Sequence, residues 1–217
     1  MISRPRRNRV TPEGEIEETP YRGMWMGNRG DLHSGDGGLG LRRWRNKRWI
    51  TCTLDPGKGR GVTFDAPGRY YPLFFYDEAV ALAAGHRPCA HCRRPAFNRF
   101  FSAWQSASVC GSAAELDAAL HHSRLDSKNQ RRFEARLCDL PQGVFVAGLE
   151  VGASPLLLWN DRLFPWSHAG YEKAIKIGPT QRVNVLTPMA IVATLNAGYV
   201  IRPRLDQQLA NIDGYAS

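Results

Sequence analysis

The segment at residues 85–92, GHRPCAHC, constrains the fold more than any other part of the chain. Asp77 is a favourable N-cap for a helix over residues 78–84, and Gly85 and Pro88 are typical of a helix end. Two cysteines separated by two residues, directly after a helix end, can both direct their sulfur atoms at one zinc ion at about 2.3 Å. The same pair also fits two small buried apolar side chains or a redox dithiol. The spacing indicates a knuckle and leaves metal binding open.

Residues 73–94, LFFYDEAVALAAGHRPCAHCRR, resemble the second half of the Ada-type metal-binding domain. That domain is a small zinc module of DNA alkylation-repair proteins and related nucleic-acid-processing proteins. In the family an aromatic strand leads into a short helix ending in Ala-Gly, and an Arg-Pro-Cys-x-x-Cys knuckle supplies two of four zinc ligands. The likeness is close over this run and loose over residues 21–94. It implies a zinc cofactor held in part by Cys89 and Cys92.

The other two ligands of the Ada-type domain are not matched in the same way. The family takes them from a Cys-x-x-x-Cys or His-x-x-x-Cys pair on an earlier strand, whereas His33 is followed by glycine at position 37. The only cysteine upstream of the knuckle is Cys52. The resemblance therefore implies the ligands His33, Cys52, Cys89 and Cys92, with Asp31, Asp36, His86 and His91 as substitutes. A degenerate knuckle that folds without metal stays the alternative.

The positive charge of the chain lies mainly in its first two thirds. Of the 29 basic and 20 acidic side chains that give a net charge of +9, residues 1–140 hold 23 and 15. An excess of this size favours a polyanionic partner, which we take to be DNA. The Gly-rich stretch at residues 34–40 lacks the Lys-Ser/Thr ending of a phosphate-binding loop, so no nucleotide cofactor is expected.

The compartment is predicted from the apolar runs and the cysteines. No stretch of about 18 apolar residues is present, which predicts no membrane-spanning helix and no membrane partner. The five cysteines are scattered and odd in number, as is typical of a reducing compartment. We therefore expect a cytoplasmic protein, and we expect it to be a monomer.

A basic strip at residues 41–49, LRRWRNKRW, holds five basic side chains and two tryptophans. Arginine pairs with phosphate in a bidentate manner and tryptophan stacks on bases, so the strip favours a nucleic-acid contact. A solvated basic strand anchored on a core by its tryptophans is the alternative. Together with arginines around the knuckle, the predicted nucleic-acid-binding residues are Arg29, Arg42, Arg43, Trp44, Arg45, Arg48, Arg87, Arg93 and Arg94.

The nearly neutral C-terminal part is rich in aromatic residues. Trp159, Trp166 and Tyr171 can form a pocket that stacks a flipped base, although aromatic residues on β elements are more often core. Candidate catalytic residues are Asp31 and Lys47, placed to act near a sugar, and His122 as a general acid or base. None of the three stands in a spacing that demonstrates the role.

Two functional classes fit these features. The first is an enzyme that excises a modified or damaged base from DNA, a DNA glycosylase-type hydrolase of DNA repair. The second is a non-catalytic DNA-binding or regulatory protein in which the knuckle is structural. The Ada-type resemblance adds a third alternative, transfer of a methyl group from a phosphotriester to a zinc-bound thiolate, for which Cys52 is the only candidate.

The pattern of elements predicts an α+β fold. Strands are expected over residues 48–54 and 70–76, followed by helices from Pro95 or Ala96 and over residues 113–122, a mostly β region after residue 143, and a closing helix over residues 188–197 capped by Thr187 and Gly198. The expected organisation is a flexible tail at 1–19, an Ada-like DNA-facing region at 20–110, a helical connector at 111–140 and a β-rich aromatic region at 141–217.

Overall fold

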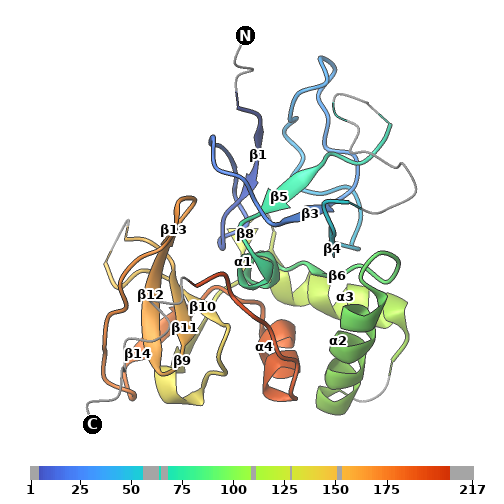
Figure 1. Cartoon of the computed structure of the whole chain (residues 1–217). Helices are drawn as coiled ribbons and strands as arrows, with labels where there is room; N and C mark the ends of the chain where they lie inside the picture. Colours follow the sequence, from blue (N-terminus) through green and yellow to red (C-terminus); the bar gives the residue numbers. More distant parts are fainter. Residues whose placement is uncertain are drawn as a thin grey trace.

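The protein has an α+β fold in which helices pack between and below two β-sheets (Figure 1). The computed structural model describes residues 5–55, 64, 68–108, 111–127, 129–150 and 153–205. One sheet is built from the N-terminal part of the chain and the other from the C-terminal part. A single connected cluster of buried apolar side chains runs from Val10 to Ile201 and joins both sheets to the helices.

The N-terminal sheet has six strands in the order β2-β1-β5-β3-β4-β6. Their bounds are β1 Arg7–Val10, β2 Ile16–Glu18, β3 Trp25–Asn28, β4 Ile50–Cys52, β5 Leu73–Phe75 and β6 Arg87–Pro88. Most neighbours are antiparallel, but β1 pairs with β5 and β4 pairs with β6 in parallel. The predicted strands over 48–54 and 70–76 form as β4 and β5, each shortened to three residues.

Residues 5–19 do not form the expected flexible tail. They make the hairpin of β1 and β2, and Val10 and Ile16 are buried in the core. The register Arg9↔Phe74 attaches the hairpin to β5. Two inward-facing apolar residues and a long-range strand pair stabilise a segment whose composition alone is too polar to form a core.

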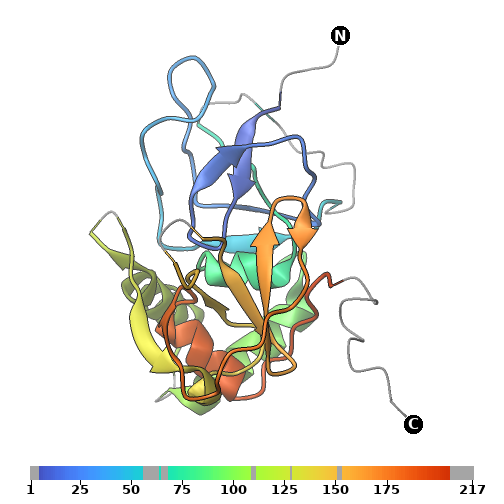
Figure 2. The same cartoon turned by 90° about the vertical axis from the view of Figure 1, so that its left-hand side faces the viewer.

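Helix α1 (Glu78–Ala83) lies between the two sheets in both views (Figures 1 and 2). The predicted N-cap is confirmed, because the Asp77 carboxylate accepts a hydrogen bond from the Val80 N–H at 2.9 Å. The helix ends at Gly85, whose φ of +83° is in the left-handed region. The His86 N–H then bonds back to the Ala81 carbonyl at 2.9 Å, which completes a Schellman-type end.

Three further helices form the lower part of the molecule, with a short 3₁₀ turn at η1 (Leu137–Asp139). They are α2 (Arg94–Ala107), α3 (Ala113–Arg124) and α4 (Met189–Asn196), and α4 packs against both α2 and α3. Helix α3 begins with a capping box between Ser112 and Glu115. Thr187 does not cap α4 as expected, because its hydroxyl accepts the Phe145 N–H at 2.8 Å and Pro188 takes the N-cap position.

The C-terminal sheet has the order β13-β12-β11-β10-β14-β9. Its strands are β9 Phe133–Arg136, β10 Phe145–Val146, β11 Leu156–Trp159, β12 Arg162–Ser167, β13 Gly170–Tyr171 and β14 Arg182–Val185. A small ladder joins β7 Leu125–Asp126 to β8 Asn129–Gln130. The predicted turn at Asn160 and Asp161 is confirmed, since both have positive φ, as a tight hairpin between β11 and β12 requires.

Candidate metal centre

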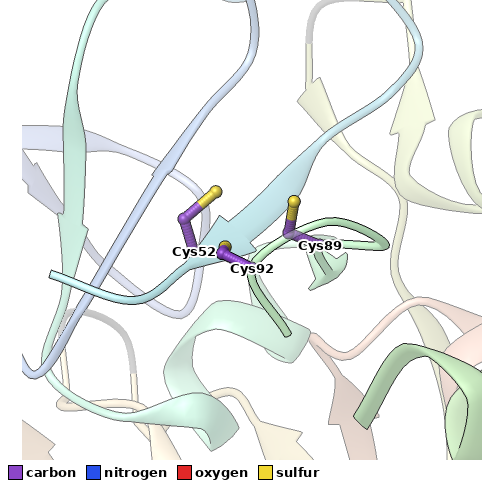
Figure 3. A group of neighbouring side chains, drawn as sticks. All are labelled: Cys52, Cys89 and Cys92. Atoms are coloured by element: carbon purple, nitrogen blue, oxygen red, sulfur yellow. The ribbon is translucent and has the colours of Figure 1, made fainter. Parts of the chain in front are cut away.

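Three cysteines from two separate segments meet at the edge of the N-terminal sheet (Figure 3). Cys52 ends β4, and Cys89 and Cys92 belong to the knuckle between β6 and α2. The parallel pairing of β4 with β6 brings them together, because the Cys89 N–H donates to the Thr51 carbonyl at 2.9 Å. The sequence places the two segments far apart, and the sheet makes them neighbours.

The three sulfur atoms lie within 4.8 Å of one another. In a tetrahedral site with metal–sulfur bonds of about 2.3 Å, neighbouring sulfurs are about 3.8 Å apart, so only small side-chain adjustments separate this cluster from a ligating geometry. Cys52 and Cys89 are buried and Cys92 is half-buried. The cluster can hold a metal ion.

Hydrogen bonds favour the thiolate form of one of these sulfurs, that of Cys89. The Cys52 thiol donates a hydrogen bond to Cys89, and the backbone N–H groups of Cys92 and His91 add to it, so the pKa of Cys89 falls well below its usual range. The His91 N–H lies 3.4 Å from the Cys89 sulfur. The same contact, together with burial, raises the pKa of Cys52. A thiolate held by backbone N–H groups is the form in which cysteine binds metal.

The surroundings of the cysteines include apolar side chains. Met26 forms one buried cluster with Cys52 and Cys89, and Ile50 and Phe74 pack against this cluster. Burial raises the pKa of Tyr70, and the nearby Cys52 and Cys92 sulfurs raise it further. Soft thiolate ligands select zinc or another soft metal, and three of them leave a fourth position for a further ligand or water.

His33 is not the fourth ligand in this structure. Its Nδ1 lies 2.8 Å from the Asp31 carboxylate, and its ring packs edge-on against Tyr71 at 5.0 Å between centroids. Among the described residues, no fourth Cys, His, Asp or Glu joins the three cysteines. The substitutes Asp31, Asp36, His86 and His91 are therefore outside the group as well. The resemblance placed His33 by sequence order alone, and the Asp31 contact holds it elsewhere.

Three of the arginines predicted to bind nucleic acid are buried, and they contact other parts of the protein. Arg87 makes a bidentate ion pair with Asp117 at 2.7 and 2.8 Å. Arg93 pairs with Glu78 at 2.6 Å and lies 3.8 Å above the Trp25 ring. Arg29 is also buried. The prediction that these three contact DNA is wrong for the folded protein, because their guanidinium groups do not reach the surface.

The basic strip does lie at the surface. Arg42, Arg45 and Arg48 are exposed, as is Arg94 at the start of α2. Arg43 pairs with Glu15 and keeps a third of its side chain exposed. Trp44 is 37% exposed and packs edge-on against His121, with 4.5 Å between ring centroids.

A second basic surface, not predicted from the sequence, is a hollow of about 520 Å³ beside β1 and β5. Among the described residues its lining holds three arginines, two phenylalanines and no acidic residue: Pro5, Arg6, Asn8, Arg9, Arg22, Gly23, Leu54, Phe64 and Phe74. The two phenylalanine rings are stacked with 6.2 Å between centroids. Arg6 lies over Phe64 and Arg9 over Phe74, at 5.0 and 4.9 Å. We call this surface the arginine–phenylalanine hollow.

The predicted base pocket is part of the core instead. Trp166 and Tyr171 are buried, and the Tyr171 hydroxyl donates to the Asp77 carboxylate at 2.8 Å. Trp159 is half-buried against the same core. Because protein atoms cover the rings of Trp166 and Tyr171, they offer no face to a base.

The candidate catalytic residues have separate surroundings. The Asp31 carboxylate accepts hydrogen bonds from His33 and from the Gly68 N–H, which hold its pKa below the usual range. Lys47 lies in the exposed strip, and His122 is exposed on α3. Within the described part of the chain, no hydrogen bond joins the three into one constellation.

No family model, no curated protein and no solved structure matches this chain. The resemblance of residues 73–94 to the Ada-type domain therefore stays a prediction. Among the described residues, no helix has the length and apolar character needed to cross a membrane.

Proposed function

We propose that this protein is a zinc-containing DNA-binding protein in which the three-cysteine centre supports an adjacent basic and aromatic surface. One observation carries the proposal: Phe74 packs against the buried cluster of Met26, Cys52 and Cys89 and also lines the arginine–phenylalanine hollow. Phe74 on β5 thus connects the cysteine centre, through Met26 on β3, to the candidate contact surface.

The donor set favours zinc. Cysteine sulfur is a preferred ligand of zinc, and one of the three sulfurs is favoured as a thiolate by the Cys52 hydrogen bond and by backbone N–H groups. A fourth ligand, such as water, would complete a tetrahedral site. A bound zinc ion would cross-link β4 to the knuckle, and through the knuckle to the start of α2. The Ada-type resemblance supports the same metal and the same two knuckle ligands.

The shape and charge of the hollow favour nucleic acid. Arginine guanidinium groups pair with phosphate oxygens, and aromatic rings stack on bases without sequence preference. In the hollow, burial and the nearby charge of Arg22 lower the pKa of Arg9. The three arginines concentrate positive potential in the hollow, which suits a phosphodiester backbone. The basic strip at residues 41–49 extends the positive surface.

Base excision is the weaker candidate. It needs an open aromatic pocket, and Trp166 and Tyr171 are buried. Methyl transfer to Cys52 is weaker too, because that thiol is buried and its pKa is raised. The proposal therefore takes DNA binding as the function and leaves chemistry on the DNA to be detected by experiment.

The metal is tested by measuring zinc in the purified protein by mass spectrometry. We expect one zinc per chain in the wild type and in Cys138→Ser, since Cys138 is exposed and outside the cluster. We expect loss of zinc in Cys52→Ser and Cys89→Ser. Zinc content that is unchanged by either substitution would remove the metal from the proposal.

DNA binding is tested by fluorescence anisotropy with undamaged, alkylated and hypermodified duplexes and single strands over a range of salt concentrations. Arg9→Ala and Arg22→Ala are expected to weaken binding uniformly, each lowering the slope of log affinity against log salt by about 0.9 for one duplex phosphate contact. Arg182→Ala is the matched control, because Arg182 is exposed but lies in the C-terminal sheet and pairs with Glu134. Equal effects of all three variants would refute the assigned surface.

The same samples, treated with alkali, report on catalysis. Intact strands with retained binding support a pure binder. Cleavage at one type of modified base would restore base excision as the function.

A further inference from the structure

Two buried arginines lie over the same tryptophan at the junction of the N-terminal sheet and the helices. Arg29 and Arg124 are each only 1% exposed. Their guanidinium carbons lie 4.1 and 4.4 Å from the centre of the Trp49 ring. Neither residue has a place in the DNA-binding surface, and both are fully charged at neutral pH.

The hydrogen-bond donors of the two guanidinium groups are only partly used. Arg29 donates from Nε to His86 Nε2 at 3.3 Å and from Nη1 to the Gly14 carbonyl at 3.0 Å. Arg124 donates from Nη1 to the Lys47 carbonyl at 2.9 Å. Arg29 Nη2, Arg124 Nε and Arg124 Nη2 are buried without a partner within the described part of the chain.

The His86 side chain adds another donor. It is fully buried, and burial followed by the charges of Arg29 and Arg124 lowers its pKa well below the ordinary value, so the ring is neutral. Since Nε2 accepts from Arg29, the proton of the neutral ring is on Nδ1. That N–H is also buried without a partner in the described residues.

Nearby carboxylates do not neutralise the two arginines. Asp117 is held by both arms of Arg87, and Glu15 pairs with Arg43. Glu13 lines the cavity but pairs with Arg132 at 3.9 Å and keeps 35% of its side chain exposed. Arg29 and Arg124 repel each other, and each has a further cation nearby, Arg43 for Arg29 and Arg87 for Arg124. Two buried positive charges without a dedicated counter-charge cost several kcal/mol, so a native fold normally supplies one.

A small cavity lies beside both guanidinium groups. Its lining includes Arg29, Arg124, Trp49, Gln130 and Arg43 together with one carboxylate, Glu13, and its internal space is about 10 Å³, about what one water molecule or one ion of similar size needs. A water bridging the guanidinium groups to the unpartnered Gln130 carbonyl would complete hydrogen bonds but would leave both charges uncompensated. An anion compensates both.

Access to the cavity comes from a neighbouring hollow. This hollow has a volume of about 230 Å³ and shares Gly14, Arg29 and Arg43 with the cavity. Arg7 and Arg42 also line it, with one acidic residue, Glu15, which pairs with Arg43. The approach is therefore basic, which favours entry of an anion.

We propose that Arg29 and Arg124 form a buried binding site for a compact inorganic anion of the size of chloride. The anion accepts hydrogen bonds from the free N–H groups of both arginines. It joins the N-terminal sheet, through Arg29, to the end of α3, through Arg124. The site is distinct from the cysteine centre and from the arginine–phenylalanine hollow, and it stands whether or not the protein binds DNA.

The first test measures unfolding in urea at constant ionic strength, with sodium gluconate replaced stepwise by sodium chloride or sodium phosphate. Above the dissociation constant, a tenfold rise in chloride is expected to raise the folding equilibrium constant roughly tenfold, because the anion binds only the folded chain. Arg124→Met is expected to abolish this dependence, and Arg182→Met, at an exposed ion pair, to retain it. A response to phosphate with none to chloride would overturn the proposal, because a cavity of about 10 Å³ does not admit an oxyanion of that size.

The second test keeps the proposal falsifiable if Arg124→Met fails to fold. Crystals of the wild-type protein soaked in bromide are expected to give an anomalous peak within hydrogen-bond distance of both guanidinium groups. Equal wild-type stability in gluconate, chloride and phosphate would overturn the proposal. So would an unchanged anion dependence in Arg124→Met, or bromide peaks confined to the molecular surface.

Discussion

The ion pair between Arg87 and Asp117 is expected to be the strongest single electrostatic contact in the protein. Two charge-assisted hydrogen bonds of 2.7 and 2.8 Å join the guanidinium to the carboxylate, and the two side chains are only 3% and 13% exposed. Arg87 also lies 4.9 Å over the Phe97 ring on α2. The pair therefore ties β6, two residues before the knuckle, to helix α3.

Replacing Asp117 with alanine leaves the Arg87 charge buried. Of the guanidinium hydrogen bonds seen among the described residues, only the 2.9 Å bond to the Pro88 carbonyl then survives. Breaking one side of a buried pair costs about 3–5 kcal/mol, which in a chain of this size lowers the melting temperature by roughly 6–20 °C. Asp117→Asn keeps one acceptor oxygen, so its cost is expected to be at the lower end of this range of unfolding free energy.

Urea and thermal unfolding of the variants measure this cost. The matched control is Glu134→Ala, which removes the exposed pair with Arg182 and is expected to cost less than about 1 kcal/mol. The double variant Arg87→Met with Asp117→Ala is expected to recover most of the loss, because no unpaired charge stays buried. The reasoning is refuted if Asp117→Ala matches the control, or if the double variant is no more stable than the single one.

Three further predictions concern the core and the end of α1. The lowered pKa of His86 means that the unfolded state binds the proton more tightly, so stability is fully present above the unfolded value of 6.5 and falls as pH drops through it, by up to about 1.4 kcal/mol per pH unit. His86→Gln is expected to flatten this part of the wild-type curve of unfolding free energy against pH, and parallel curves would contradict it. Gly85→Ala is expected to cost about 2–3 kcal/mol in urea unfolding, since φ is +83° and the added Cβ would lie 2.9 Å from Arg124 Nε. Gly68→Ala, with φ of +85° and no atom within 4 Å of the added Cβ, is expected to cost only about 1 kcal/mol; equal costs would exclude the contact. Trp166→Ala is expected to cost about 3–5 kcal/mol in unfolding while leaving DNA affinity measured by anisotropy unchanged; a selective loss of binding to one modified base would restore the base pocket.

Local chemistry predicted some elements well. The N-cap Asp77, the helix end at Gly85 and the hairpin turn at Asn160 and Asp161 depend on a few neighbouring residues, and all three are confirmed. The α+β class follows from the same kinds of local signal, namely helix caps, helix ends and turns. The meeting of Cys52 with the knuckle was predicted through the resemblance, and the structure confirms that these sulfurs lie together.

Contacts between residues that are far apart in the chain could not be predicted from the sequence. The hairpin at residues 7–18 is stabilised by β5, which lies far along the chain. Arg87 and Arg93 look like surface cations beside the knuckle until Asp117 on α3 and Glu78 on α1 are placed next to them. Aromatic residues on strands fit a pocket and a core equally well, and only packing distinguishes the two.

The burial of α1 bears on whether the cysteine centre is a portable module. All residues from Ala79 to Ala83 are inaccessible to solvent, and the start of the helix is held from the C-terminal side. Tyr171 donates to Asp77 and Tyr199 donates to Glu78, both at 2.8 Å. An excised N-terminal fragment would expose this helix and lose both contacts. Transplanting the centre to another protein would therefore require a replacement surface that covers α1, so the unit that evolution or design can move is the whole chain around that helix.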